Sequence, residues 1–478
     1  MSGQNSFKTF NPLKNTFNTE IYYADTSEDL KNKIELAAAA ADILSKTSWI
    51  EISTFLQEIK AQLISRKASI SKMYLSETGL DYSRFEIEFT RTLNQLTHFS
   101  DFIQSKEWGN LNELEEYNEG KILLKKKIPI GPIMVMGASN FPLAYSTIGG
   151  DSVAAISARC PVILKAHPYH AGTSIEVYKA ISKAIVNCGL PPGTFSHILD
   201  DGYEKAAHLS QHKTIKGIGF TGSQLGGEAI IDLVNSRKES IPVFAEMGSI
   251  NPVFILDLKE SSVADLANKL AHAVCNDRGQ FCTKPGVIFV PNNRNGNALC
   301  NQLKNNIINY DSGPMLHPKI KENFEMKTSA IKTQGINIHF YESDKKEDFH
   351  VSNKVMIVGD KEYKSLDALR KEIFGPFTSI VMYDQDPQVY LKAFDGQLTC
   401  SVFSDERENE NSRNSIIQLA MHKAGRVIIN DVPTGVSVCK NMHHGGPYPA
   451  SSDSRFTAVG SDSIKRFIRD VTIQLKVN

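Results

Sequence analysis

The sequence predicts an α/β fold with two parallel sheets that carry helices on both faces. Short apolar runs alternate with amphipathic runs at the spacing of strand–helix units, and Gly and Pro separate the units. The first alternating region has expected strands at 133–136, 162–165, 195–199, 216–220 and 242–245, and expected helices at 143–158, 173–187, 202–210 and 223–235. The second, from about residue 251 to 446, has expected strands at 252–256, 287–290, 355–357, 379–383 and 426–430. Such sheets bind ligands at the carboxyl ends of their strands.

The ends of the chain follow other patterns. An irregular polar lead over 1–27 precedes a helical segment over 28–102, where apolar residues recur at three- and four-residue steps. Residues 121–128 and 463–477 alternate as strands do. The terminal strand needs a partner, which we expect to be the 121–130 strand or another subunit. The polar residues 340–350 are expected to form a surface loop.

Composition excludes several classes of protein. Lys plus Arg and Asp plus Glu both number 53 in 478 residues, so no basic surface for nucleic acid or membrane is indicated. Apolar runs are too short for a membrane span, and the N-terminus lacks the features of a signal peptide. Seven cysteines without a CxxC pattern favour neither a disulfide framework nor a zinc site. We therefore expect a protein of the reducing cytoplasm.

Cys282 is the candidate nucleophile. It lies in the stretch 277–286, between a helical run and a β-like run, where solvent and a ligand can reach a thiolate held by rigid elements. Most cysteines are small buried hydrophobes, so Cys282 stands out only with supporting groups elsewhere.

Four other stretches offer such groups. Gly222 and Ser223 lie where a strand meets a helix, which suits a phosphate, although no GxGxxG fingerprint is present. Glu246 lies in an apolar setting, which fits either a general base or a structural carboxylate. Asn140 fits either an oxyanion donor or a helix N-cap. Lys165 fits either a ribose or phosphate ligand or a surface lysine, and the nearby His167 and His170 indicate no metal site.

Taken together these motifs resemble the aldehyde dehydrogenase superfamily. The segments that carry the resemblance follow the family's order: 137–142, 220–223, 246–249, 279–283 and 372–376. The stretches 165–174, 248–254, 280–286, 444–450 and 464–469 resemble the branch that acts on α-ketoglutaric semialdehyde (2,5-dioxopentanoate). The resemblance implies two Rossmann-type domains and a small β oligomerisation arm. The expected dinucleotide-binding domain comprises 1–113 and 134–246, the catalytic domain 247–446, and the bridging strands 114–133 and 447–478.

The resemblance also implies the roles of the site residues. Cys282 would attack the aldehyde, Asn140 and the Cys282 N–H would hold the oxyanion, and Glu246 would activate the water that hydrolyses the thioester. The residues expected to bind NAD or NADP are Lys165, His167, Gly222, Ser223, Glu372 and Phe374. Phe141, Arg278 and Thr283 are the candidate substrate contacts, with Arg278 either facing a distal carboxylate or simply solvated.

NADP is the expected cofactor, with NAD as the second candidate, because Pro168 stands where NAD-preferring relatives carry a glutamate. Without that acid, a 2′-phosphate meets no like charge. The expected product is a free acid, from 2,5-dioxopentanoate or, alternatively, from a medium- or long-chain aliphatic aldehyde. The residues also leave open a CoA-acylating enzyme, a cysteine hydrolase and a catalytically silent binding protein. The hydrolase would need a histidine partner for Cys282, and no recognisable motif supplies one. A homodimer or homotetramer is expected.

Overall fold

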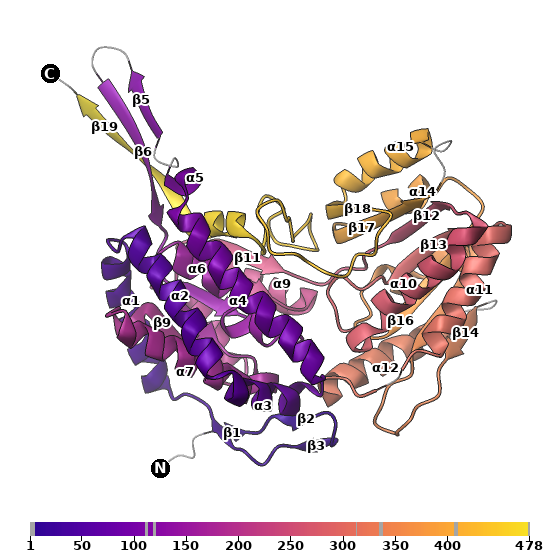
Figure 1. Cartoon of the computed structure of the whole chain (residues 1–478), viewed down its shortest axis with the longest axis horizontal. Helices are drawn as coiled ribbons and strands as arrows, with labels where there is room; N and C mark the ends of the chain where they lie inside the picture. The colour runs from indigo at the N-terminus through magenta and orange to yellow at the C-terminus, as the bar shows by residue number, and fades with distance from the viewer. Residues whose placement is uncertain are drawn as a thin grey trace.

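The computed structural model describes residues 5–109, 113–117, 121–311, 313–333, 338–405 and 410–476. Two α/β lobes lie side by side, and a narrow β arm projects from the first lobe and carries the C-terminus (Figure 1). In this part of the chain, every helix is too short or too polar to span a bilayer.

The first lobe is built on a five-stranded parallel sheet with the order β11-β10-β7-β8-β9. Its strands are β7 (Ile133–Met136), β8 (Val162–Lys165), β9 (Phe195–Ile198), β10 (Gly217–Thr221) and β11 (Val243–Glu246). Its helices are α1 (Ser27–Leu44), α2 (Trp49–Ser65), α3 (Lys67–Thr78), α4 (Tyr82–Gln104), α5 (Lys106–Gly109), η1 (Leu143–Thr147), α6 (Gly150–Ser157), η2 (Pro168–His170), α7 (Ala171–Asn187), η3 (Pro192–Thr194), α8 (Glu204–Gln211) and α9 (Gln224–Asn235). The lead is not irregular as expected: it forms two small antiparallel pairs, β1 (Ser6–Phe7) with β4 (Tyr22–Tyr23) and β2 (Phe10–Asn11) with β3 (Thr16–Phe17).

The second lobe holds a seven-stranded sheet with the order β14-β15-β16-β13-β12-β17-β18, parallel except for β14. Its strands are β12 (Val253–Asp257), β13 (Val287–Pro291), β14 (His339–Glu342), β15 (Lys354–Gly359), β16 (Phe377–Tyr383), β17 (Gln397–Ser404) and β18 (Ala424–Ile429). Its helices are η4 (Glu260–Ser262), α10 (Val263–Cys275), η5 (Asn276–Gly279), α11 (Arg294–Ile308), α12 (Pro318–Lys332), α13 (Asp360–Ser365), η6 (Asp367–Arg370), α14 (Gln388–Lys392) and α15 (Glu410–Met421).

The arm is an antiparallel sheet with the order β19-β6-β5. It consists of β5 (Glu113–Tyr117), β6 (Lys121–Pro129) and β19 (Ile468–Lys476), with η7 (Ser461–Phe467) leading into β19. The register runs from Ile468 opposite Pro129 to Lys476 opposite Lys121. The prediction that the terminal strand pairs with the 121–130 strand is therefore confirmed.

Local sequence explains why the first helices begin where they do. Thr26 and Asp29 form a capping box at the start of α1, and Ser48 and Glu51 form another at the start of α2. The buried faces of α2 and α4 then pack with the first sheet in one hydrophobic core. This core makes the first lobe a rigid support for the loops at its sheet edge.

Three further expectations of secondary structure were wrong. The expected helix 143–158 is two helices, because the chain turns near Gly149. The turn brings the backbone of residues 144–146 so close that a side chain at position 149 would come within 2.7 Å of it. Strand β17 was missed because its Gln, Thr and Ser residues look polar, yet the whole strand is buried. Strand β14 occupies the start of the expected 340–350 loop, where it pairs with β15.

The order of the first sheet determines where a ligand can bind. The chain passes from β7 to β8 and β9 on one side, then returns to β10 on the other side of β7. Connections that leave in opposite directions open a crevice at the carboxyl ends of the two strands. Asn140 follows β7 and Ser223 follows β10, so both lie at this switch point.

Candidate active site

The loop that carries Cys282 is shaped by unusual backbone geometry. Helix α10 ends at Cys275, and Asp277, Arg278 and Gly279 follow with φ of 48°, 59° and 62°. This left-handed region disfavours side chains other than glycine, so surrounding contacts must stabilise it. Arg84 supplies one, since its Nε donates to Oδ2 of Asp277 at 2.6 Å. A side chain at Gly279 would come within 2.4 Å of the Gly375 carbonyl oxygen, so only glycine fits there.

Asn251 fixes the backbone around the sulfur. Its Nδ2 lies within hydrogen-bond distance of the carbonyl oxygens of Cys282 (2.8 Å), Lys284 (3.1 Å) and Ser249 (3.2 Å). Its Oδ1 accepts a hydrogen bond from the Thr399 hydroxyl on the buried strand β17. The cysteine loop is therefore attached to the second sheet by one buried amide.

The Cys282 thiol lies in a cluster with Glu246 and His444. His444 Nε2 is 3.7 Å from Cys282 Sγ and 2.8 Å from Glu246 Oε1. The Glu246 and His444 side chains are 4% and 1% exposed, so their contact is shielded from bulk water. The candidate ligand atoms of the three residues all lie within 4.8 Å of one another. That a metal is absent from the working enzyme stays a prediction.

Burial and nearby charge act on the thiol. Burial is the largest cause that raises the pKa of Cys282 well above its usual range, and the charges of Glu246 and Glu372 add to it. The neutral thiol is thus the stable form, whereas nucleophilic attack needs the thiolate. A group that removes the proton must therefore lie within reach of sulfur, and both His444 and Glu246 do.

His444 was not identified from the sequence as a partner of Cys282. It lies 444 − 282 = 162 positions after the cysteine, so no local pattern connects them. The segment around it is placed by backbone pairing, because Met247 N donates to the Ala450 oxygen at 2.8 Å and Ser452 N donates to the Ala245 oxygen at 2.9 Å. The His-Gly-Gly sequence was the available signal, and it needed the fold to be interpreted.

Asn140 approaches the cysteine loop from the first lobe. Its Nδ2 donates to the Gln280 carbonyl at 2.8 Å, two residues before Cys282. An amide nitrogen has two protons, so one hydrogen bond leaves a second donor. The structure therefore brings Asn140, Glu246 and Cys282 to one place.

The switch point of the first sheet is where this kind of fold binds ligands. Ser223 caps α9, since its hydroxyl accepts from Gly226 N at 3.2 Å, and the helix start presents further N–H groups to a phosphate. The Lys165 ammonium, at the carboxyl end of β8, donates to the Asp200 carbonyl at 2.9 Å. Since an ammonium has three donors, Lys165 can also bind a ligand oxygen.

Two other predicted cofactor residues have structural contacts of their own. A side chain at Gly222 would come within 2.7 Å of the Phe220 ring, so this glycine lets a neighbouring aromatic ring pack. His167 Nδ1 accepts from Tyr169 N at 3.2 Å at the start of η2, and burial holds the pKa of His167 well below its usual range. Their roles toward a cofactor stay predictions.

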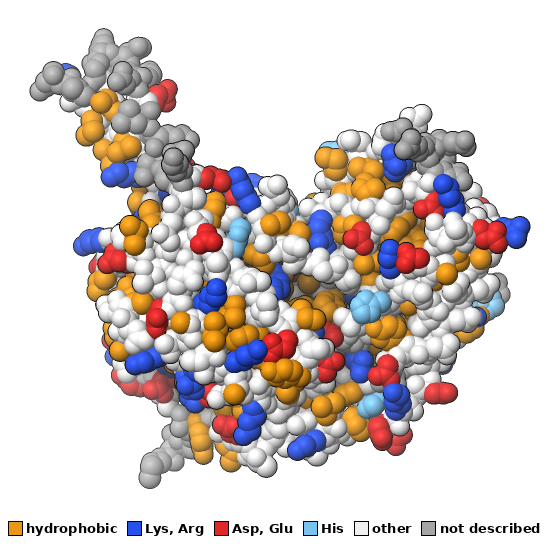
Figure 2. Space-filling view, in the orientation of Figure 1, with side chains coloured by type: hydrophobic (Ala, Val, Ile, Leu, Met, Phe, Trp, Pro, Cys, Tyr) orange, Lys and Arg blue, Asp and Glu red, His pale blue; other side chains and the backbone are white. Residues whose placement is uncertain are grey.

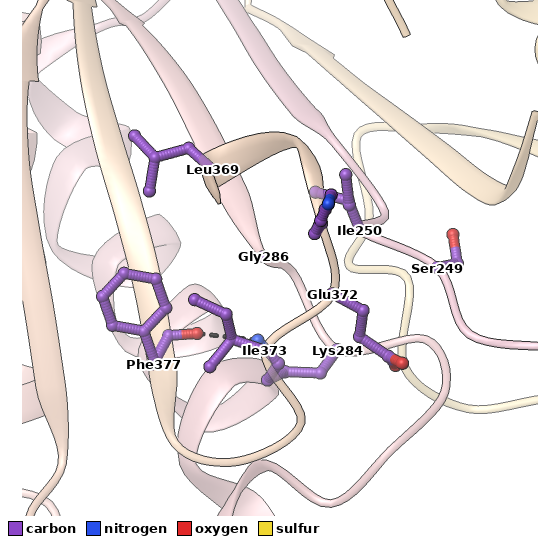
Figure 3. Close-up of a pocket in the computed structure, with 9 residues that line it drawn as sticks. Ser249, Ile250, Lys284, Gly286, Leu369, Glu372, Ile373 and Phe377 are labelled. Atoms are coloured by element: carbon purple, nitrogen blue, oxygen red, sulfur yellow. Dashed lines mark hydrogen bonds between the residues drawn. The ribbon is translucent and has the colours of Figure 1, made fainter. Parts of the chain in front are cut away.

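Glu372 lies in a small pocket with Lys284, shown in Figure 3. Burial raises the pKa of Glu372 to about 7, and burial lowers the pKa of Lys284 to about 8 while the Glu372 charge opposes that change. A side chain at Gly248 would come within 2.0 Å of the Glu372 carboxylate, so glycine makes room for this acid. Phe374, two residues on, is half-buried.

The three predicted substrate residues lie in different settings. The Phe141 ring packs 5.4 Å from that of Phe281 and beneath the Arg84 guanidinium, next to the cysteine loop. Thr283 is buried beside Cys282. Arg278 turns toward Gly313, and its NH2 lies 3.9 Å from Asp311. Its contact with substrate stays a prediction.

A thiol, an imidazole and a carboxylate in one cluster define an enzyme that works through a covalent cysteine intermediate, and His444 supplies the histidine that the cysteine-hydrolase alternative lacked. Comparisons with known proteins narrow this class. The chain matches the aldehyde dehydrogenase family over residues 1–470. It is 35% identical to the alpha-ketoglutaric semialdehyde dehydrogenase of Acinetobacter baylyi, over 90% of this chain and 83% of that protein. It is 31% identical to alpha-ketoglutaric semialdehyde dehydrogenase 2 of Azospirillum brasilense, over 98% of this chain and 91% of that protein.

Solved structures agree on the fold. A variant of Thermus thermophilus 1-pyrroline-5-carboxylate dehydrogenase superposes with a TM-score of 0.86 at 16% identity, over 100% of this chain and 91% of that one. The glyceraldehyde-3-phosphate dehydrogenase of Methanocaldococcus jannaschii, complexed with NADP, gives 0.83 at 16% identity over 100% of both chains. The chain belongs to the aldehyde dehydrogenase family, whose enzymes oxidise aldehydes with NAD or NADP.

Proposed function

We propose that this aldehyde dehydrogenase oxidises 2,5-dioxopentanoate to 2-oxoglutarate, with NADP as the preferred cofactor. The substrate is supported by relatives at 31% and 35% identity that are named for it. The observation that carries the chemistry is the cluster of the partly buried Cys282 with the buried His444 and Glu246. A medium- or long-chain aliphatic aldehyde is the competing substrate, favoured by the Phe141 and Phe281 rings beside the cysteine loop.

The first half of the reaction uses three side chains. As Cys282 sulfur bonds to the carbonyl carbon, His444 Nε2 takes the thiol proton across 3.7 Å. The carbonyl electron pair moves to oxygen, where the free Asn140 N–H and the Cys282 backbone N–H stabilise the negative charge. Glu246, 2.8 Å from Nε2, stabilises the imidazolium that forms. NAD or NADP, when bound, supplies the acceptor for the hydride whose loss leaves a thioester on Cys282.

The second half uses Glu246. Its carboxylate accepts a proton from water as the water oxygen bonds to the thioester carbon. The C–S bond then breaks, the acid leaves, and the thiolate regains a proton. This step distinguishes a free-acid product from CoA acylation, which needs no water-activating base.

NADP preference rests on the surroundings of Lys165. We propose that its ammonium pairs with the 2′-phosphate, because an ammonium binds phosphate oxygens through charge-assisted hydrogen bonds. Pro168, which begins η2, brings no carboxylate to this position. Ser223 and the N-terminus of α9 bind the diphosphate, and Glu372 binds the ribose next to the nicotinamide.

We also propose that the arm joins copies of this chain into a dimer or tetramer. Figure 2 shows hydrophobic side chains on the projecting arm, and Ile473 and Leu475 are 36% and 49% exposed. A sheet edge with exposed apolar residues is stabilised when a second copy covers it. A reducing cytoplasm remains our proposal for its location.

The test compares substrates and cofactors in one assay. Purified enzyme is given 2,5-dioxopentanoate, glutarate semialdehyde or hexanal with NADP or NAD, and the reduced cofactor is followed by absorbance. We expect the highest kcat/KM with 2,5-dioxopentanoate and NADP, and no activity from Cys282→Ala. A higher kcat/KM with hexanal would reject the proposed substrate, and a wide preference for NAD would reject the proposed cofactor.

A further inference from the structure

A hollow of about 560 Å³ opens between helix α4 and the loop that precedes His443. Its lining comes from Glu86, Ile87, Thr90, Arg91, Asn94, Val436, Ser437 and Val438. Glu86 is the acid in this set, and its charge is paired with Lys67 at 2.7 Å. Arg91 is therefore the residue that gives the hollow its positive charge.

Arg91 is connected to the reaction centre through one tyrosine. Its NH2 donates to the Tyr145 hydroxyl at 3.0 Å, and its guanidinium carbon lies 4.8 Å from the Tyr145 ring centroid. The same ring is 5.9 Å from the His444 ring, and His444 Nε2 is 3.7 Å from Cys282 Sγ. Arg91 is thus connected to the sulfur through two side chains, those of Tyr145 and His444.

Part of the Arg91 guanidinium has no hydrogen-bond partner among the described residues. NH2 also reaches the Val436 carbonyl at 3.4 Å, but NH1 is buried without a hydrogen-bond partner among the described residues. No carboxylate of the described residues forms an ion pair with Arg91, whereas Arg84 nearby is bound by Glu88 and Asp277. A buried donor without a partner costs free energy unless a ligand satisfies it.

A second arginine adds charge near Tyr145. Arg426, on β18, donates to the carbonyl oxygens of Pro433 and Gly435, and its charge acts on both Tyr145 and Cys282. Two arginine side chains therefore lie near Tyr145, next to a reaction centre that contains Glu246. An acidic aldehyde is attracted to such a site, and a neutral one gains nothing from it.

We propose that Arg91, with the Tyr145 hydroxyl beside it, forms an anion subsite that binds the far carboxylate of a short dicarboxylic semialdehyde while its carbonyl carbon lies at Cys282. The inference rests on the proposed function and deepens it, because it assigns the binding of the substrate's far carboxylate to Arg91 rather than to Arg278. A planar guanidinium can bind a carboxylate through two parallel hydrogen bonds.

The test measures a ratio, which separates recognition from folding. In Arg91→Met we expect the ratio of kcat/KM for 2,5-dioxopentanoate to that for hexanal to fall about 10- to 100-fold, mainly through KM. Arg91→Lys should recover part of it. The matched control is Arg294→Met, at a site 87% exposed, which should leave the ratio as in the wild type. If Arg91 only holds the Val436 segment in place, both substrates lose activity together and the ratio stays constant, which overturns the subsite.

A wild-type measurement covers the case in which Arg91→Met fails to fold. Glutarate should inhibit hexanal oxidation competitively with a Ki at least about 10-fold below that of dimethyl glutarate, which lacks the charges. Equal inhibition overturns the anion subsite while aldehyde oxidation itself stands. Loss of oxidation of every aldehyde by the wild type would instead overturn the proposed function.

Discussion

Replacing His444 by phenylalanine is expected to slow acylation of Cys282 near neutral pH. The substitution keeps an aromatic ring and removes the nitrogen that lies 3.7 Å from sulfur. An ordinary cysteine is only a few per cent thiolate at pH 7. Because burial and the Glu246 and Glu372 charges raise the pKa of Cys282 further, its spontaneous ionisation is smaller still.

The size of the effect follows from general base catalysis. A positioned base contributes about 10²- to 10⁴-fold, so we expect kcat/KM near neutral pH to fall at least about 100-fold, or about 2.7 kcal/mol of transition-state stabilisation. The loss should shrink as pH rises, because hydroxide increasingly removes the thiol proton without His444. A flat deficit at every pH would indicate a packing defect instead.

Two measurements distinguish these outcomes. Stopped-flow absorbance follows the first turnover, and the rate of Cys282 alkylation by iodoacetamide reports its thiolate directly across the neutral to alkaline range. The control is His422→Phe, the same exchange at an exposed histidine. If the alkylation rate and its pH profile are the same in His444→Phe and the wild type, His444 does not take the proton.

Four further predictions address the rest of the molecule. Glu246→Gln should slow the first-turnover burst of reduced cofactor, because the imidazolium loses its partner, and should lower the steady-state rate further, by about 100-fold, because the thioester accumulates; loss of the burst altogether would contradict its role after acylation. Lys165→Met should lower the NADP-to-NAD ratio of kcat/KM about 10- to 100-fold, and an unchanged ratio would exclude pairing with the 2′-phosphate. His197 is buried, and burial lowers its pKa from 6.5 to about 3. The unfolded chain therefore binds a proton below about pH 6.5 that the folded chain does not, and from about pH 7 to about pH 5 this lowers the free energy of unfolding by about 2 kcal/mol. In His197→Gln, the free energy of unfolding measured with urea should fall by about 2 kcal/mol less than in the wild type over this pH range. An equal fall in both proteins would refute the assignment. Leu475→Lys should reduce the mass measured by light scattering, whereas Met326→Lys, an exposed site on α12, should not; an unchanged mass would remove the arm from the interface.

Much of this architecture could be predicted because its signals are local. Alternating apolar runs mark the strands of both sheets, and Cys282 stands at a helix–strand junction where the chain must turn. The carboxyl ends of parallel strands meet at one edge, so residues just after β7, β10 and β11 come together although they are far apart in sequence. Asn140, Ser223 and Glu246 could be named from their local settings and from the family resemblance, and the sheet edge explains why they meet.

The features that escaped prediction depend on distant contacts. Strand β17 has Thr399 and Ser401 in its buried interior, and only the Asn251 side chain explains why a hydroxyl at 399 is satisfied there. His444 has no nearby partner in sequence, and its position depends on a segment that returns from the second lobe to the edge of β11. Patterns of neighbouring residues contain no information about such a return.

The cysteine loop is held from both lobes, which explains how the reaction centre can be rigid between two separately packed cores. From the first lobe, Arg84 binds Asp277 and Asn140 binds the Gln280 carbonyl. From the second lobe, Asn251 binds the Cys282 carbonyl. Each contact alone is one polar interaction of modest net free energy, but all act on one short loop whose left-handed residues are strained without them. The sulfur therefore keeps its distance to His444 and Glu246 only while the lobes stay in register, so the lobe interface is part of the catalytic apparatus.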